Sequence, residues 1–423
     1  MLVDVAYGTT GIEVEVPDDA HVIAPNHLAP ASDAAAEIRR ALGAPIASAR
    51  LKELARDART VAIAVCDATR PQPREVVVPA LLDELGTIVD PADIVVIIAT
   101  GTHRPSTEKE RLAMFGRDLL RRVRVIDHDA RDRSALVEVR VPGLDLPVQI
   151  ARAFVEADLR ITTGFVEPHF FAGFSGGPKL VAPGLAGIDT VLGLHDARRI
   201  GDPRATFGVI AGNPVHDDVR AIARAVGVHF ALDVVLDGSQ QLVRAFAGEL
   251  SAMHARACEL VRATTMVEVP GRFDIVVGSN AGWPLDQNLY QAVKGVAAAC
   301  EVVKPNGLVL VAAECRDGLP AHGEFHRLLQ QASSPKAFLE TLARAGRTVA
   351  DQWQAQVLAR CQSWARIALH TQGVDDATLR SLHLESAADL DDALAGELKA
   401  CGGSARVCVL PEGPRTIPVL AAG

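Results

Sequence analysis

The chain has 423 residues, a formal net charge of −9, and a composition that is 49% apolar and 22% charged. These values are typical of globular proteins and exclude a disordered or fibrous chain. The length exceeds what a single hydrophobic core usually serves, so we expect two domains. The acidic balance argues against a nucleic-acid-binding surface, which requires clustered basic residues.

Membrane association and secretion are not expected either. No apolar run approaches the roughly 18 residues that a membrane-spanning helix needs. The first residues show no basic segment followed by an apolar one, so no secretory signal is predicted. Seven cysteines are scattered along the chain without a Cys-x-x-Cys pair. This pattern is typical of reduced thiols, and it predicts a cytoplasmic protein.

Short β-branched segments alternate with helical patterns along the chain. The predicted strands are Thr60–Val65, Ile94–Thr100, Asp158–Thr163, Phe273–Val277, Leu308–Ala313 and Ala405–Leu410. The predicted helices are Arg74–Leu85, a helix after Thr107, where Thr107 and Glu110 have the spacing of a capping box, Asp217–Val226 and Leu285–Cys300. The alternation predicts an α/β fold of two domains, each built around a largely parallel, doubly wound sheet.

The predicted domain boundary is the segment Thr264–Arg272, which contains Pro270 and Gly271 and precedes a new strand. We place the division near residue 268, with an N-terminal domain of residues 1–268 and a C-terminal domain of residues 269–423. Two-domain α/β enzymes usually bind their ligands between the domains, at the carboxyl ends of strands. We therefore expect an active site in an interdomain cleft.

Polar residues follow the first two predicted strands. Asp67 and Arg70 come directly after one strand, and His103 lies in the loop after the next, beyond Gly101. A guanidinium suits bidentate binding of a substrate carboxylate, and a nearby Asp can orient a histidine. Histidine can take and return a proton near neutrality. The alternatives are a surface ion pair and an exposed loop histidine.

The loop Thr163–Lys179 follows the third strand and contains four of the chain's seventeen aromatic residues, several glycines, His169 and Lys179. Glycines allow a close approach of the backbone and expose N–H groups, so this loop is interpreted as an anion-binding segment with a functional lysine. It is not a P-loop, because Pro178 interrupts the pattern and no Ser or Thr follows the lysine. An ordinary connecting loop is the alternative.

His195 lies sixteen residues beyond Lys179. A lone histidine is more often structural than a metal ligand, and both interpretations stay open at this point. Imidazole binds nickel, zinc and copper, but the sequence offers no cysteine or carboxylate cluster for a conventional zinc site. A metal at His195 would therefore need help from a non-protein ligand.

A further polar stripe is predicted after the strand Phe273–Val277. If a helix begins near Pro284 or Leu285, then Gln287, Gln291 and Lys294 share one of its faces. Such a face can bind a carboxylate or a carbonyl group. A polar face turned to solvent is the alternative.

Taken together, these segments resemble the nickel-dependent lactate racemase family, whose members racemise or epimerise 2-hydroxy acids. The resemblance covers nearly the whole chain, from Tyr7-Gly8 onwards. It is most specific in Asp67-Ala68-Thr69-Arg70-Pro71, Gly101-Thr102-His103-Arg104, Glu167-Pro168-His169, Ser175-Gly176-Gly177-Pro178-Lys179, and Gln291 with Lys294.

The resemblance implies a nickel-pincer nucleotide cofactor, a pyridinium-3-thioamide-5-thiocarboxylic acid mononucleotide that carries nickel. By this resemblance Lys179 is the residue that is linked covalently to the cofactor, Gly176 and Gly177 contribute to its binding, and His195 is a nickel ligand. Members of the family depend on cofactor-biosynthesis proteins for maturation, so such proteins are expected partners.

The resemblance also implies that His103 and His169 are the catalytic acid/base residues. The substrate, a small 2-hydroxy acid, is then bound by Asp67, Arg70, Gln291, Lys294 and Trp353. The implied reaction is a reversible hydride transfer to the cofactor through a 2-keto acid intermediate, in which the cofactor carries the difficult step.

Two other functions remain open. The first is a non-catalytic protein that binds hydroxy acids or nucleotides on the same scaffold; replacement of Lys179 or of either catalytic histidine would favour it, and none is replaced. The second is a zinc hydrolase that uses His103, His169 and His195. It would be active with zinc and would need no pyridinium nucleotide.

Overall fold

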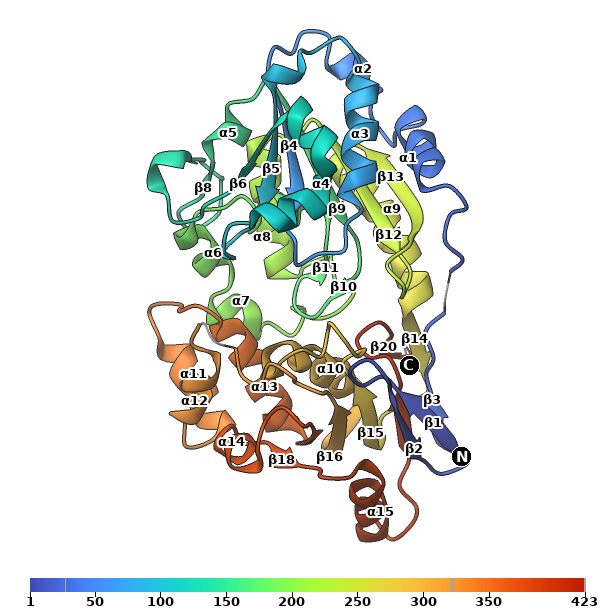
Figure 1. The fold of residues 1–423 in the computed structure, drawn as a ribbon. Coiled ribbons are helices and arrows are strands. Elements are labelled where there is room, and N and C mark those ends of the chain that lie inside the picture. The colour runs from blue at the N-terminus through green and yellow to red at the C-terminus, as the bar shows by residue number, and fades with distance from the viewer. Residues whose placement is uncertain (27, 321–322, 422–423) are drawn as a thin grey trace. The chain divides into compact units, whose positions relative to one another are not determined.

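A computed structural model describes residues 1–26, 28–320 and 323–421 (Figure 1). The described residues form two compact units. The first unit holds residues 28–194 and 208–262, and the second holds residues 1–26, 195–207 and 263–421. The structure thus divides the chain differently from two contiguous domains that meet at residue 268. The chain start and the segment that begins with His195 belong to the second unit.

The first unit is built around a six-stranded sheet with the order β13-β12-β9-β4-β5-β6. Only the edge strand β13 is antiparallel to its neighbour. The strands are β4 Val61–Cys66, β5 Ile94–Ala99, β6 Arg124–Asp127, β9 Leu159–Phe165, β12 Phe230–Leu236 and β13 Leu242–Gly248. Every residue of β4 is buried, because helices cover both faces of a parallel sheet.

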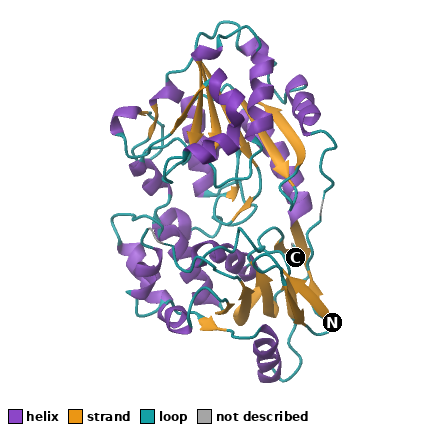
Figure 2. Ribbon diagram, in the orientation of Figure 1, coloured by secondary structure: helices purple, strands orange, loops and turns teal. Residues whose placement is uncertain are grey.

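Figure 2 shows helices around this sheet. Alternate residues of β4 belong to two separate cores: Ile63 and Val65 pack with α1, α3 and α4, while Ala62 and Ala64 pack with α5, α6, α8 and α9. The helices are α1 Ala34–Gly43, α2 Leu51–Leu54, α3 Arg74–Leu85, α4 Glu108–Arg122, α5 Arg152–Val155, α6 Ile188–Leu194, α8 Pro214–Val226 and α9 Leu250–Thr265. Two small antiparallel pairs complete the unit: β7 Leu136–Glu138 with β8 Gln149–Ala151, and β10 Pro168–His169 with β11 Gly173–Phe174.

The second unit contains a six-stranded, fully parallel sheet with the order β18-β17-β16-β15-β19-β3. Its strands are β3 His21–Val22, β15 Phe273–Ser279, β16 Val303–Ala312, β17 Arg366–His370, β18 Glu385–Ser386 and β19 Val407–Leu410. The pairing of β3 with β19 explains why the start of the chain belongs to this unit. The smaller strands are β1 Leu2–Val5 and β2 Ile12–Glu15, which form a hairpin, and β14 Met266–Val269 and β20 Ile417–Leu420, which pair in parallel.

The hairpin of β1 and β2 and the helix α15 share a hydrophobic core with this sheet, through residues such as Val5, Val14, Ile275 and Leu394. The helices are α7 Ala197–Gly201, α10 Leu289–Cys300, α11 Phe325–Gln330, α12 Pro335–Arg344, α13 Gln352–Trp364, α14 Asp376–Ser381 and α15 Leu390–Ala400. Among the described residues, no helix is both long and apolar enough to cross a membrane.

The predicted α/β fold with largely parallel sheets is confirmed, and all six predicted strands are present as β4, β5, β9, β15, β16 and β19. The capping box is confirmed as well. The Glu110 N–H donates to the Thr107 hydroxyl oxygen at 3.2 Å, and the Thr107 N–H donates to the Glu110 carboxylate at 2.7 Å. This pair fixes the start of α4.

The prediction that a helix begins near Pro284 or Leu285 is wrong, because α10 begins at Leu289. The Asn288 side chain caps the helix by accepting from the N–H of Gln291 at 3.0 Å. The preceding turn is held by the buried carboxylate of Asp286, which accepts from Gly8 N at 2.7 Å and from Glu314 N at 3.0 Å. Gln287 therefore lies outside the helix, and only Gln291 and Lys294 share a helical face.

We expect Gly295→Ala to lower the free energy of unfolding by about 1–3 kcal/mol, the usual effect of an overpacked contact. A Cβ at Gly295 in α10 would overlap the carbonyl oxygen of Ser279 at the end of β15. Urea unfolding followed by circular dichroism measures the change. An unchanged stability of Gly295→Ala would contradict the close packing of α10 on β15.

Gly396→Ala is the matched control for this substitution. Gly396 lies in α15, and apart from its chain neighbours and the backbone of its own helix, no atom of the described residues comes within 4 Å of the position that an added methyl group would occupy. The substitution should stabilise the protein by up to about 1 kcal/mol, because alanine has the higher helix propensity.

Candidate active site

The loops that carry the first predicted residues lie at one edge of the first unit's sheet. Strands β9, β4 and β5 are parallel neighbours, so their carboxyl ends meet at the same edge (Figure 1). Asp67 follows β4, His103 follows β5, and His169 follows β9. In open parallel sheets this edge is the usual place for ligand binding.

Asp67 and His103 form a direct pair. Asp67 Oδ2 lies 2.7 Å from His103 Nδ1, and the Thr69 hydroxyl donates to Asp67 Oδ1 at 2.8 Å. The Asp67 side chain is 8% exposed, whereas that of His103 is 51% exposed. Burial by itself would raise the pKa of Asp67, but the hydrogen bond and charge of His103, the Thr69 hydroxyl and the charge of Arg70 together lower it.

An ionised carboxylate can only accept hydrogen bonds, so His103 carries a proton on Nδ1. In neutral His103 the other nitrogen, Nε2, then has a free lone pair and can accept a proton. The Asp67 carboxylate also stabilises the imidazolium that forms when it does so. The pair is therefore arranged as a general base.

Two residues that the sequence analysis missed hold the Asp67 loop in place. The Arg74 guanidinium is buried and donates to the carbonyl oxygens of Asp67 and Arg70, both at 3.1 Å. Gln72, also buried, accepts from Cys66 N at 2.9 Å and donates to the Thr163 hydroxyl at 2.8 Å. In the sequence, the only indication of this role was that both residues are polar and come directly after the Asp67 motif.

His169 lies in β10, and its ring packs between two aromatic neighbours. Its ring centroid is 5.1 Å from that of Phe170, in a stacked arrangement, and 4.5 Å from that of Phe171, edge to face. His169 Nδ1 accepts from the N–H of Ala172 at 3.3 Å. Neutral His169 therefore carries its proton on Nε2, which is the opposite tautomer to that of His103.

Lys179 follows two glycines with left-handed backbone conformations, Gly176 at φ 72° and Gly177 at φ 51°. Its amine lies 5.6 Å from the centroid of the Phe171 ring. Burial, followed by the charge of Arg70, lowers the pKa of Lys179 to about 7, while the charge of Glu167 opposes this. About half of the amine is then neutral near pH 7, and a neutral amine is a nucleophile.

Arg70 links the loops after β4 and β9. Its guanidinium lies 3.8 Å from the Glu167 carboxylate, and both side chains are partly exposed. The pair is loose enough for the guanidinium to bind a carboxylate ligand in addition to Glu167.

The remaining predicted residues belong to the second unit. His195 is buried, and its ring centroid lies 4.6 Å from that of Trp353 on α13. The helix α7, which follows His195, is held on α13 by Gln356, which donates to Ala197 O at 2.8 Å, and by Arg360, which donates to Ile200 O at 2.8 Å. Helix α13 thus fixes the segment that carries His195.

Gln291 and Lys294 lie on one face of α10, and both are partly buried. Tyr290, which the sequence analysis missed, joins α10 to α13. Its hydroxyl oxygen accepts from Trp353 Nε1 at 3.2 Å, and its carbonyl oxygen accepts from Gln354 Nε2. The contacts of Trp353 with both Tyr290 and His195 bring three chain segments together within this unit.

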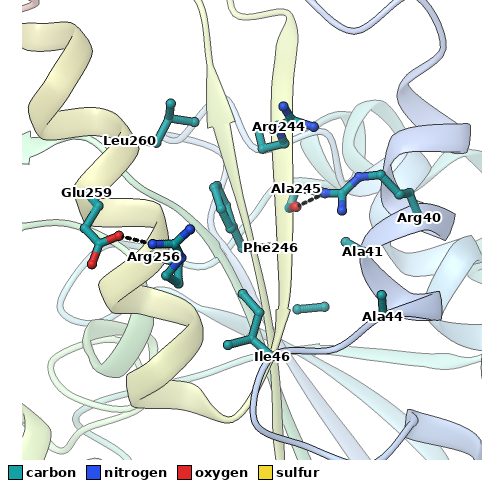
Figure 3. A pocket seen from close by; sticks show the side chains of 11 residues that line it. Arg40, Ala41, Ala44, Ile46, Arg244, Ala245, Phe246, Arg256, Glu259 and Leu260 are labelled. Atoms are coloured by element: carbon teal, nitrogen blue, oxygen red, sulfur yellow. Dashed lines mark hydrogen bonds and ion pairs between the residues drawn. The ribbon is translucent and has the colours of Figure 1, made fainter.

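A surface hollow of about 510 Å³ lies elsewhere in the first unit, over α1, β13 and α9 (Figure 3). Arg40, Arg244 and Arg256 line it, but each guanidinium forms an ion pair with a nearby glutamate. Arg40 and Arg244 share Glu37, and Arg256 pairs with Glu259, so two carboxylates offset two of the three positive charges and little net charge is left to attract an anion. None of the predicted site residues is among those that line it.

Within residues 1–26, 28–320 and 323–421, no three or more His, Cys, Asp or Glu side chains are grouped as metal ligands. His103 and His169 belong to the first unit and His195 to the second, so neither unit alone holds the three histidines of a zinc hydrolase. A metal bound by a single histidine and a non-protein ligand needs no such group.

Comparisons with known proteins address the family directly. Residues 7–208 match the model of the lactate racemase N-terminal domain, and residues 269–417 match that of the lactate racemase C-terminal domain. A lactate racemase of Thermoanaerobacterium thermosaccharolyticum is 36% identical over 382 residues, covering 90% of this chain and 89% of the relative. A lactate racemase of Lactiplantibacillus plantarum is 36% identical over 378 residues, covering 89% of each protein.

Solved structures agree with these matches. The lactate racemase apoprotein from T. thermosaccharolyticum superimposes with a TM-score of 0.92 at 33% identity, over 99% of this chain and 100% of the other. A Thermotoga maritima protein superimposes with a TM-score of 0.66 at 18% identity, over 92% of this chain and 98% of that one, which shows a shared fold alone. The predicted family is thus confirmed: the chain belongs to the lactate racemase family and is an isomerase of the racemase type.

Proposed function

We propose that this protein racemises lactate, or a closely related small 2-hydroxy acid, with a nickel-pincer nucleotide that is bound covalently at Lys179. The observation that carries the proposal is the set of groups at the sheet edge of the first unit. Two histidines that can take and return protons and an amine with a lowered pKa are the groups that the proposed chemistry uses. The names of the two 36% identical relatives support lactate as the first substrate to test.

The residues fit such a cofactor chemically. The Lys179 amine is neutral often enough to form a covalent bond to an acyl-type group, and Gly176 and Gly177 add no side chains of their own to the turn that precedes it. The buried His195 imidazole is a suitable nickel ligand. When bound, the cofactor supplies an electrophilic pyridinium carbon that can receive the substrate's α-hydrogen reversibly as hydride.

The protein's own task is to move the proton of the substrate hydroxyl group. We assign this proton to His103 Nε2 for one enantiomer, with the Asp67 carboxylate stabilising the imidazolium. His169 returns a proton from Nε2 to the keto oxygen of the bound 2-keto acid. It does so as the imidazolium, in which Nδ1 is also protonated and has given up its hydrogen bond from Ala172 N. His103 gains one proton as His169 loses one, and reaction of the opposite enantiomer reverses both transfers.

The substrate carboxylate needs cationic and hydrogen-bonding partners. We assign these roles to Arg70 and Lys294, with Gln291, Asp67 and Trp353 as further substrate-binding residues. The guanidinium of Arg70 provides bidentate binding. Cofactor-biosynthesis proteins are the proposed partners for maturation, and a cytoplasmic location is part of the proposal because all seven cysteines are free thiols.

The test is racemisation of single lactate enantiomers by protein that was co-expressed with cofactor-biosynthesis enzymes, followed by chiral chromatography. We expect both enantiomers to reach the same equal mixture, and about one nickel per chain by metal analysis. A loaded protein that binds lactate without racemising it or any other 2-hydroxy acid would favour the non-catalytic binding function instead.

A further inference from the structure

The glycine turn before Lys179 rests on a buried floor of side chains from β12 and α9. Asp233, in β12, is fully buried, and its Oδ2 accepts from the N–H of Gly177 at 2.6 Å. Burial raises the pKa of Asp233 to about 6, against the effect of backbone hydrogen bonds from Gly177 and, to a smaller extent, Gly164. A carboxylate in such a place needs local partners that offset its desolvation, and the Gly177 amide is the first of them.

His254, in α9, forms the second part of this floor. It is buried, and its Nε2 lies 2.9 Å from the carbonyl oxygen of Ser175, to which it donates. Its ring stacks on that of His216, with centroids 5.7 Å apart. Burial lowers the pKa of His254 to about 4, so the ring is neutral at pH 7 and its one N–H is used for Ser175.

The two glycines fit this floor without space for a side chain. A Cβ on Gly176 would lie 2.6 Å from Asp233 Oδ2, and a Cβ on Gly177 would lie 2.5 Å from His254 Cγ. The turn closes with a hydrogen bond from Lys179 N to Gly176 O at 3.1 Å. Asp233 and His254 therefore fix the backbone of this turn and, with it, the position of the Lys179 side chain.

We propose that Asp233 and His254 are positioning residues that hold the Gly176–Gly177 turn and thereby set the reactivity of the Lys179 amine. They come from residues 209–268, which neither matched domain model covers. The inference rests on the proposed function only in giving Lys179 a covalent role. Neither residue touches the reacting atoms in this assignment; both act through Lys179.

The pH dependence of Lys179 reactivity depends on the charged and titratable groups that surround its amine. Arg70 from the loop after β4 and Glu167 from the loop after β9 act on its charge. The positive charge of Lys179 in turn contributes to lowering the pKa of His216 in α8 and of His254 in α9, which lie beneath the turn. A displaced turn changes the distances of the amine to all four groups and its contact with water, so the pH profile of the amine must change.

The experiment is competitive acylation of the full-length apoprotein with trace acetic anhydride between pH 5 and 10. Peptide mass spectrometry then gives the labelling of Lys179 relative to that of Lys304, a partly exposed lysine in the second unit. In the wild type we expect half-maximal reactivity of Lys179 near pH 7. For Asp233→Ala and His254→Phe we expect the profile to move toward that of an ordinary lysine, about 10.4, with at least about a tenfold loss of relative labelling at pH 7.

Conservative and matched variants separate positioning from a loss of stability. Asp233→Asn keeps an oxygen acceptor for Gly177 N and should restore most of the wild-type profile. Asp286→Asn is the matched control, because Asp286 is an equally buried carboxylate that accepts backbone N–H groups in the second unit. It should leave the Lys179 profile unchanged. Circular dichroism establishes which variants are folded, and if Asp233→Ala is not, His254→Phe decides the question.

A wild-type Lys179 profile in folded Asp233→Ala or, failing that, in folded His254→Phe would overturn the proposal. Because the labelling uses neither nickel nor nucleotide, it can succeed even if the loaded protein proves not to be a racemase. Conversely, the protein could prove to be an active racemase while both substitutions leave the pH profile of Lys179 labelling unchanged. The proposed function would then stand, and only the positioning role of Asp233 and His254 would be overturned.

Discussion

Lys179→Ala is expected to abolish covalent loading of the cofactor. Wild-type protein co-expressed with cofactor-biosynthesis enzymes should show an increased intact mass and about one nickel per chain, and the variant should show neither. The reason is that Lys179 combines a lowered pKa with a position directly after the Gly176–Gly177 turn, so its amine is the nucleophile that the structure presents there. Racemisation should fall to the background rate in the same preparation.

Lys304→Ala is the control for this prediction. Lys304 forms an ion pair with Asp274 at 2.8 Å, is partly exposed, and lies in β16 of the second unit. Its replacement should leave the mass increase and the nickel content unchanged. A Lys179→Ala protein that still gains the mass would show that another residue carries the cofactor.

His103→Ala should lower the racemisation rate by about two to four powers of ten, the usual contribution of a general acid/base group. His169→Ala should cause a loss of the same order, since each enantiomer's hydroxyl proton meets one of the two histidines. Asp67→Asn should give an intermediate loss, because it removes the charge that stabilises the His103 imidazolium but leaves the His103 side chain in place. Initial rates from each lactate enantiomer, at saturating concentration, measure all three effects.

The control for the histidine variants is His229→Ala. His229 is exposed, and its Nδ1 accepts a hydrogen bond from Arg160 N at 3.0 Å. It has no part in the Asp67–His103 pair. Its variant should keep the wild-type rate. Full activity of His103→Ala, with nickel and cofactor bound, would remove His103 from the acid/base role, and the same outcome for His169→Ala would remove His169.

The sequence was sufficient to predict those features that depend only on residues close together in the chain. The strands β4, β5 and β9 are short β-branched runs, and the polar residues that follow a parallel strand must emerge at its carboxyl end. For that reason the placement of Asp67, His103 and His169 at one edge could be predicted. The capping box of Thr107 and Glu110 is equally local, and it too is present.

The start of α10 could not be predicted in the same way. Proline and leucine at residues 284–285 are compatible with a first helical turn. The competing structure is a turn held by Asp286, whose partners Gly8 and Glu314 are far away in the sequence. Long-range hydrogen bonds of a buried carboxylate therefore outweighed the local preference.

What the sequence determined by itself is the α/β fold, the family and the strand-end positions of the polar residues, because hydrophobic periodicity and motif spacing are properties of short segments. Only the tertiary structure decided that residues 1–26 and 195–207 join the second unit, through the pairing of β3 with β19 and the packing of α7 on α13. It also placed Asp233 and His254 beneath the Lys179 turn. These contacts join residues many positions apart, and their energy comes from burial and hydrogen bonds that exist only in the folded chain.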